Sequence, residues 1–172
     1  MKKKILILGL IIAICISAFV VYYACSSNAG DTVESREVLL DKAIATGENW
    51  NIVKEAKIEG FIISAAYSTD NKSTLAVFEP EANGKYKFST SVNRKSDEII
   101  IGGAIINGDW YDFVWFNGAQ TEYAEIVYTI NGKENKTLKF DTTDMDIIYN
   151  KNPEKEYELS VCYYDSEGNK YE

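Results

Sequence analysis

The sequence predicts an α+β fold that is mainly β, with a short helix packed on an antiparallel β-sandwich or a curved meander sheet. Apolar and polar residues alternate in short segments after residue 48, as they do in half-buried antiparallel strands. Asn-Gly pairs between apolar runs are typical of hairpin turns, because both residues tolerate the positive φ of a type I′ turn. Four such pairs divide the chain: Asn83-Gly84, Asn107-Gly108, Asn117-Gly118 and Asn131-Gly132.

Residues 1–25 predict a membrane anchor or a signal segment. Lys2, Lys3 and Lys4 precede an uncharged apolar run over residues 5–24. At about 1.5 Å of rise per residue, a helix of that length crosses the roughly 30 Å hydrocarbon core of a bilayer. The lysines favour a cytoplasmic N-terminus, so we expect the rest of the chain outside the cytoplasm, at the cell membrane.

Three fates of this segment stay open. It is longer than the about 7–15 residues of a secretory apolar region, which favours an uncleaved anchor. The sequence from Ala24 to Ser26 resembles the end of a bacterial lipoprotein signal, in which Cys25 would be lipidated. Tyr22, however, stands where that signal usually has an aliphatic residue. Ser27 and Ala29 form the small-x-small pattern of a signal peptidase site.

Residues 26–31 are predicted to be a short linker, and residues 32–172 are long enough for a single β-rich domain. Three of the 18 basic residues lie at positions 2–4 and all 26 acidic residues follow position 30, so residues 31–172 have a net charge of −11. Such acidity repels phosphate backbones, and we therefore expect no nucleic acid partner.

The helix is expected to begin at Asp31 or Thr32 and to end before Gly47. Asp31 and Glu34 have the spacing of a capping box, Leu40 and Ile44 lie on one face, and a glycine often follows a helix. In the segment 85–92, strict alternation places Tyr86, Phe88, Thr90 and Val92 on one face. The expected strands cover residues 49–58, 61–67, 73–78, 85–92, 98–106, 109–116, 121–130, 136–140, 156–164 and 170–172.

The chain has no histidine, which excludes Ser-His-Asp and Cys-His catalysis and nearly all zinc and haem sites. We therefore expect no cofactor and no enzymatic activity. A carboxylate-based hydrolase stays as an alternative, because its two acidic residues need only lie close together in space. Cys162 is the one cysteine of residues 32–172, so a disulfide within the domain is excluded.

Asp141, Asp144 and Asp146 form the densest acidic cluster and are a candidate calcium site. Calcium takes about six to eight oxygen ligands. The spacing differs from that of an EF-hand loop, and the alternative is a solvated loop whose side chains accept hydrogen bonds from backbone amides.

The aromatic segment 109–116 is the other candidate site, through Trp110, Tyr111 and Trp115. Alternation puts Tyr111 and Trp115 on one face and Trp110 with Asp112 on the other. If one face is exposed, its rings form a platform for a sugar or a protein. The alternative is a central strand that is buried on both faces, by a sheet and by a helix.

From these observations we expect a membrane-tethered extracytoplasmic protein that acts without enzymatic chemistry as a protein-interaction or accessory module. Its partners would be the membrane, through residues 5–24, and a membrane or surface protein. A module that binds carbohydrate or cell-wall glycan through the aromatic strand is the first alternative. A carboxylate-based hydrolase is the second.

Overall fold

The computed structural model describes residues 30–44, 47–95, 99–116, 122–142, 146–152 and 156–171. The predicted anchor, Cys25, the Asn117-Gly118 pair and Asp144 lie outside these ranges. Within them, no helix is long and apolar enough to cross a membrane. The elements are α2 (Val33–Ile44), β1 (Trp50–Ile58), β2 (Phe61–Ser68), β3 (Lys72–Pro80), the 3₁₀ helix η1 (Ala82–Gly84), β4 (Tyr86–Lys95), β5 (Ile100–Ile106), β6 (Asp109–Trp115), β7 (Tyr123–Ile130), β8 (Lys133–Asp141), β9 (Ile147–Lys151), β10 (Glu158–Tyr164) and β11 (Lys170–Tyr171).

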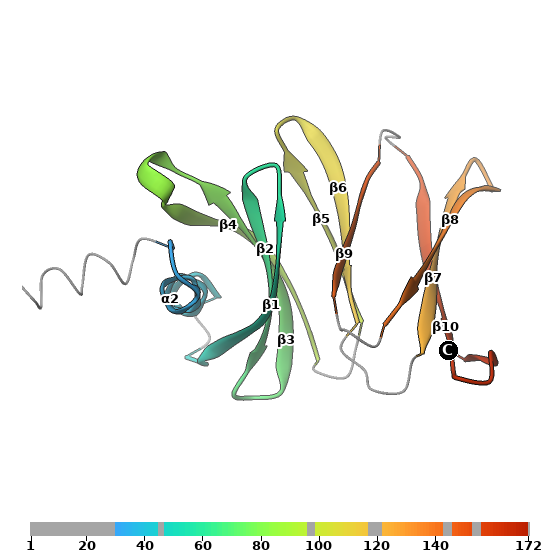
Figure 1. The fold of residues 1–172 in the computed structure, drawn as a ribbon, viewed down its shortest axis with the longest axis horizontal. Helices are drawn as coiled ribbons and strands as arrows, with labels where there is room; N and C mark the ends of the chain where they lie inside the picture. The colour runs from blue at the N-terminus through green and yellow to red at the C-terminus, as the bar shows by residue number, and fades with distance from the viewer. Residues whose placement is uncertain are drawn as a thin grey trace, which may run out of the picture.

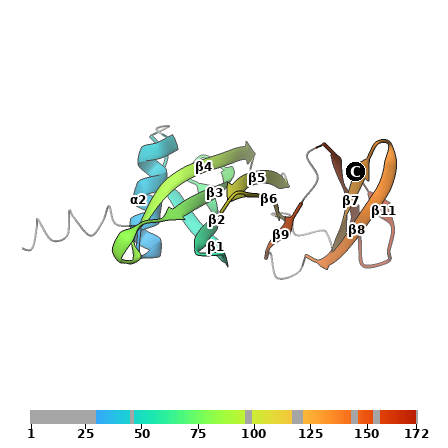
Figure 2. The same ribbon diagram turned by 90° about the horizontal axis from the view of Figure 1, so that it is seen from above.

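The described strands form three antiparallel sheets. Sheet A has the order β1-β2-β3-β4, sheet B the order β5-β6-β9, and sheet C the order β11-β10-β7-β8. Figures 1 and 2 show that α2, sheet A, sheet B and sheet C follow one another along the long axis of the molecule. The predicted class, mainly β with one short helix packed on antiparallel sheets, is confirmed.

Each pair of neighbouring layers encloses its own hydrophobic cluster. Leu40 of α2 packs against Ile62 and Phe78 on one face of sheet A. Ile63 and Leu75, on the other face of sheet A, pack against Phe113 and Trp115 of sheet B. A third cluster joins sheet B to sheet C. Sheets A and B are therefore covered on both faces, which explains the nearly continuous apolar sequence of β2.

A bulge in β4 changes which face its aromatic residues occupy. The pairing of β3 with β4 shifts register between Val77 and Phe78. As a result, Tyr86 and Phe88 pack in the cluster beside the helix, whereas Val92 packs in the cluster with sheet B. The expectation that these residues share one face was wrong, because an extra residue in a strand inverts the alternation beyond it.

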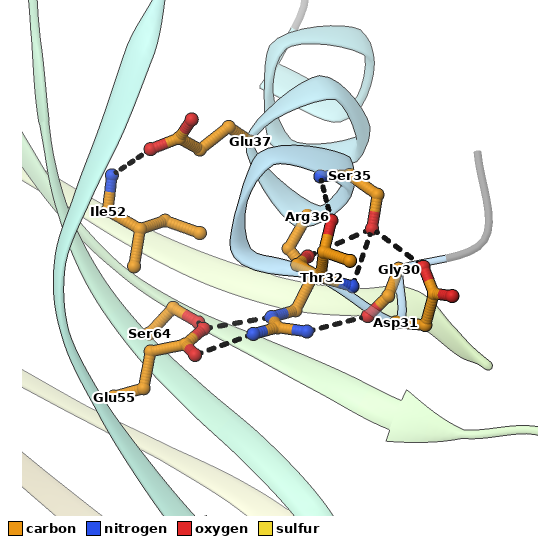
Figure 3. Close-up of polar contacts among 9 residues, drawn as sticks. All are labelled: Gly30, Asp31, Thr32, Ser35, Arg36, Glu37, Ile52, Glu55 and Ser64. Atoms are coloured by element: carbon orange, nitrogen blue, oxygen red, sulfur yellow. Dashed lines mark hydrogen bonds and ion pairs between the residues drawn. The ribbon is translucent and has the colours of Figure 1, made fainter. Parts of the chain in front are cut away.

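The start of α2 is capped by Thr32 and Ser35 rather than by Asp31 and Glu34. The Ser35 amide donates to the Thr32 hydroxyl at 3.2 Å, and the Thr32 amide donates to Ser35 Oγ at 3.0 Å (Figure 3). This is a reciprocal capping box. Asp31 contributes by accepting a hydrogen bond from the Ser35 hydroxyl.

Two carboxyl groups of α2 cover the edge of sheet A. Glu37 Oε1 accepts a hydrogen bond from the Ile52 amide at 2.7 Å, and Asp41 Oδ1 accepts one from the Trp50 amide at 2.8 Å. Figure 3 shows the first of these contacts. Strand β1 is the outer strand of its sheet, so the helix satisfies amides that would otherwise be open to pairing with another chain.

Candidate functional site

Strand β6 is the middle strand of sheet B, and its two faces meet different sheets. Tyr111 and Trp115 are buried in the cluster with sheet A, where the Tyr111 hydroxyl donates to Glu59 Oε1 at 2.7 Å. Trp110 points to the opposite face and is 41% exposed. The structure therefore does not bring the three predicted rings to one surface. Sheet A covers one face of β6, and sheet C covers the other face at Val114 but leaves Trp110 partly exposed; the helix covers neither.

Trp110 lies beside an exposed isoleucine. Ile105 on β5 is its direct cross-strand partner and is 66% exposed. Gly103, two residues before Ile105, leaves room for the indole: a Cβ at this position would lie 2.4 Å from Cζ2 of Trp110. We call the exposed pair the Trp110–Ile105 patch. It forms a compact apolar surface on the face of sheet B that looks toward sheet C.

The polar edge of Trp110 points inward, to a buried acidic side chain. The indole N–H donates to Asp112 Oδ1 and to the Tyr157 hydroxyl, both at 2.8 Å. The Tyr157 hydroxyl in turn donates to Asp112 Oδ1. Asp112 is 5% exposed, so these contacts hold the indole against a desolvated carboxyl group and leave mainly carbon atoms of the ring facing solvent.

A second tyrosine completes what we call the Asp112 cluster: Trp110, Asp112, Tyr128 and Tyr157. The rings of Tyr128 and Tyr157 are 5.6 Å apart between centroids. Oδ2 of Asp112 and the Tyr128 hydroxyl are buried and have no hydrogen bond of normal geometry. Burial raises the pKa of Tyr157 to about 12 and that of Tyr128 well above its usual value, with the charge of Asp112 adding to both shifts. Both hydroxyls are therefore protonated at neutral pH.

Two polar contacts lie beside the cluster, one between sheets B and C and one within sheet B. Asn150 on β9 is the cross-strand partner of Asp112, and its Oδ1 accepts a hydrogen bond from Lys136 Nζ of β8 at 2.7 Å. Lys151 Nζ lies 2.5 Å from Asp109 Oδ2. Among the ion pairs of the described residues, none involves Asp112. Its described hydrogen-bond donors are neutral.

Two members of the predicted calcium cluster are described, and both are exposed. Asp146 Oδ1 forms an ion pair with Lys54 Nζ at 2.5 Å, and Asp141 ends β8. No group of three or more Asp, Glu, Cys or His side chains that could hold a metal ion occurs in the described part of the chain. Asp144 lies outside that part, so calcium binding by the three residues together stays a prediction.

A comparison of the chain with protein-family models, with curated proteins and with solved structures found no match. Sequence reasoning singled out Trp110 but missed Ile105, Tyr128 and Tyr157. The alternation of residues predicted the two faces of β6. It could not predict the contact of Trp110 with Tyr157, because the two positions are 47 residues apart in the chain.

Proposed function

We propose that this chain is a membrane-tethered extracytoplasmic protein that binds a partner protein, without enzymatic chemistry, through the Trp110–Ile105 patch. The observation that carries the proposal is the state of Trp110. Its ring is partly exposed, while its only polar atom is held inside by Asp112 and Tyr157. A large apolar side chain that is fixed before binding loses little conformational entropy in an interface. The uncharged run over residues 5–24 supports the tether.

The surroundings of the patch favour a protein over a glycan. Sugar recognition needs free hydrogen-bonding groups beside an aromatic ring. Here the indole N–H is engaged inside the domain, Asn150 Oδ1 accepts from Lys136, and Asp109 pairs with Lys151. The immediate neighbour of the ring is the aliphatic Ile105. Paired aromatic and aliphatic groups of this kind are typical anchors of protein interfaces.

The test is covalent crosslinking on intact cells, with the full-length protein and with a secreted form that lacks residues 1–24. Ile105→Asp places a charge in the patch, and Val53→Asp places the same charge at an exposed strand position of sheet A, where Val53 is 43% exposed. We expect a crosslinked membrane or surface protein that is lost with Ile105→Asp and retained with Val53→Asp.

A tethered form that captures more of this partner than the secreted form supports the role of residues 5–24. Retention of the partner with Ile105→Asp would overturn the assignment of the patch. Isolated cell-wall glycan is tested in parallel. If the protein binds the wall material and Trp110→Ala abolishes this binding, the patch binds carbohydrate and not a partner protein.

A further inference from the structure

Asp112 is an acidic side chain that sheets B and C bury, and no described residue forms an ion pair with it. Burying a charge is costly unless it is paired. Among the described residues, the Trp110 N–H and the Tyr157 hydroxyl donate to its Oδ1, while Oδ2 has the neutral Tyr128 hydroxyl nearby but no hydrogen bond of normal geometry. The negative charge is therefore stabilised only in part within the domain, and a cation nearby would complete its compensation.

The partly exposed indole contacts this charge through its N–H edge. A hydrogen bond from the indole N–H to a carboxylate increases the electron density of the ring, and indole already has the strongest attraction for cations among aromatic side chains. The exposed ring next to the Asp112 charge is thus a surface that attracts cations.

Other aromatic rings of the domain have cations of their own. Lys139 Nζ lies 3.5 Å from the ring centroid of Tyr123 on sheet C, and the guanidinium of Arg36 lies 5.9 Å from that of Tyr86. Among the cation–π contacts of the described residues, none involves Trp110. Two described lysines beside the cluster are engaged, Lys136 with Asn150 and Lys151 with Asp109.

The charge of the domain supports a basic ligand. Residues 32–172 have the strongly acidic balance described above, and Glu156 and Glu158 flank Tyr157 in the chain. A surface of this sign attracts a basic partner at long range and raises its association rate.

We propose that the Trp110–Ile105 patch receives an arginine side chain of the partner protein, whose guanidinium stacks on the face of the indole that is hydrogen-bonded to Asp112, while an apolar neighbour contacts Ile105. The planar, weakly hydrated guanidinium stacks on aromatic faces better than an ammonium group does. This inference rests on the proposed function, because it names the chemistry of the partner at the same patch.

The experiment uses the full-length protein in neutral detergent micelles and two labelled peptides. The first peptide is acetylated and amidated and carries two arginines between leucine and glycine residues. The second has citrulline at both arginine positions, which keeps the shape and removes the charge. Fluorescence anisotropy gives the two affinities. We expect the arginine peptide to bind about fivefold tighter or more, as a cation–π contact supplies.

Matched variants locate the effect. Trp110→Ala is expected to remove the preference for arginine. Asp112→Asn should weaken binding of the arginine peptide, whereas Glu34→Gln, which removes the same charge from the exposed start of α2, should leave it unchanged.

Equal affinity for the two peptides, or binding of neither, would overturn the inference. Loss of the preference with Glu34→Gln as well would also overturn it, because the effect would then be one of net charge. The proposed function is decided separately, by the loss of the crosslinked partner with Ile105→Asp. The two claims can therefore fail independently.

Discussion

Two acidic side chains at two layer boundaries of this protein differ in whether a cationic side chain pairs with them. Glu55 lies between sheet A and α2, where Arg36 Nε and one terminal nitrogen donate to its two oxygens at 2.8 and 2.6 Å, and the Ser64 hydroxyl donates at 2.6 Å (Figure 3). The remaining terminal nitrogen of Arg36 donates to the Gly30 carbonyl at 2.7 Å. Asp112 lies between sheets B and C and receives neutral donors, with one oxygen unpaired.

This difference indicates that the Glu55 cluster stabilises the fold, whereas the Asp112 cluster is suited to binding a ligand. The Glu55 cluster is closed: its charges match, and it fixes the chain entry into α2 to the strand beneath it. The Asp112 cluster adds to the interior an acidic group without an ion-pair partner among the described residues, and a partly exposed indole is hydrogen-bonded to it. Stability alone does not require that arrangement, since an apolar group of similar size would avoid the desolvation cost.

Glu55→Gln is expected to have the largest effect. It leaves the buried Arg36 guanidinium without its charge partner, and breaking a buried ion pair in this way costs about 3 kcal/mol or more. The free energy of unfolding in urea measures it. The control is Glu79→Gln at the exposed pair with Lys87, where N and O are 3.3 Å apart and the loss should stay below about 1 kcal/mol. Equal losses in the two variants would mean that the Glu55 cluster does not dock the helix.

Gly103→Ala tests the position of the indole and should cost about 1–2 kcal/mol, because the added methyl group would meet the Trp110 ring. The ring must then move, and the emission spectrum of the protein should change. In a Trp110→Ala background most of the cost should disappear, which a double-mutant cycle would show. Persistence of the full cost in that background would place the clash at the backbone of Tyr111 instead.

Tyr157→Phe removes one hydroxyl that both donates to Asp112 and accepts from Trp110. We expect a loss of about 1 kcal/mol in unfolding free energy. The indole should also become more mobile, so the fluorescence anisotropy of tryptophan should fall. Tyr149→Phe, at a half-exposed ring of β9, is the control and should change neither quantity. An unchanged anisotropy in Tyr157→Phe would show that Asp112 alone holds the ring.

Asp112→Asn is expected to have the smallest effect on stability, within about 1 kcal/mol of the parent protein in urea unfolding. The amide oxygen can still accept from Trp110 and Tyr157, and the change removes a buried charge that no described residue pairs with. A loss as large as that of Glu55→Gln would break the comparison, because Asp112 would then support the fold as Glu55 does.

Turns and strands depend mainly on residues close together in the chain, and the sequence therefore predicted most of them. Asn107 and Gly108 have φ values of 51° and 91°, and Asn131 and Gly132 have 51° and 71°, as a type I′ turn requires. The first turn separates β5 from β6 and the second separates β7 from β8, close to the expected positions. Local preferences therefore predicted the fold class and most strands, although the 3₁₀ helix at Asn83-Gly84 and the five-residue strand β9 were not foreseen.

Only the tertiary structure decided which of these surfaces are buried and which side chains meet. Alternation assigned Trp110 and Tyr111 to opposite faces of β6, but the covering of each face depends on how three sheets stack. The bulge in β4 inverted a face that alternation had assigned. The contacts of Asp112 with Tyr157 and of Arg36 with Glu55 join residues 45 and 19 positions apart. Such contacts form only when the chain packs, because side chains distant in sequence carry no local signal of their partners.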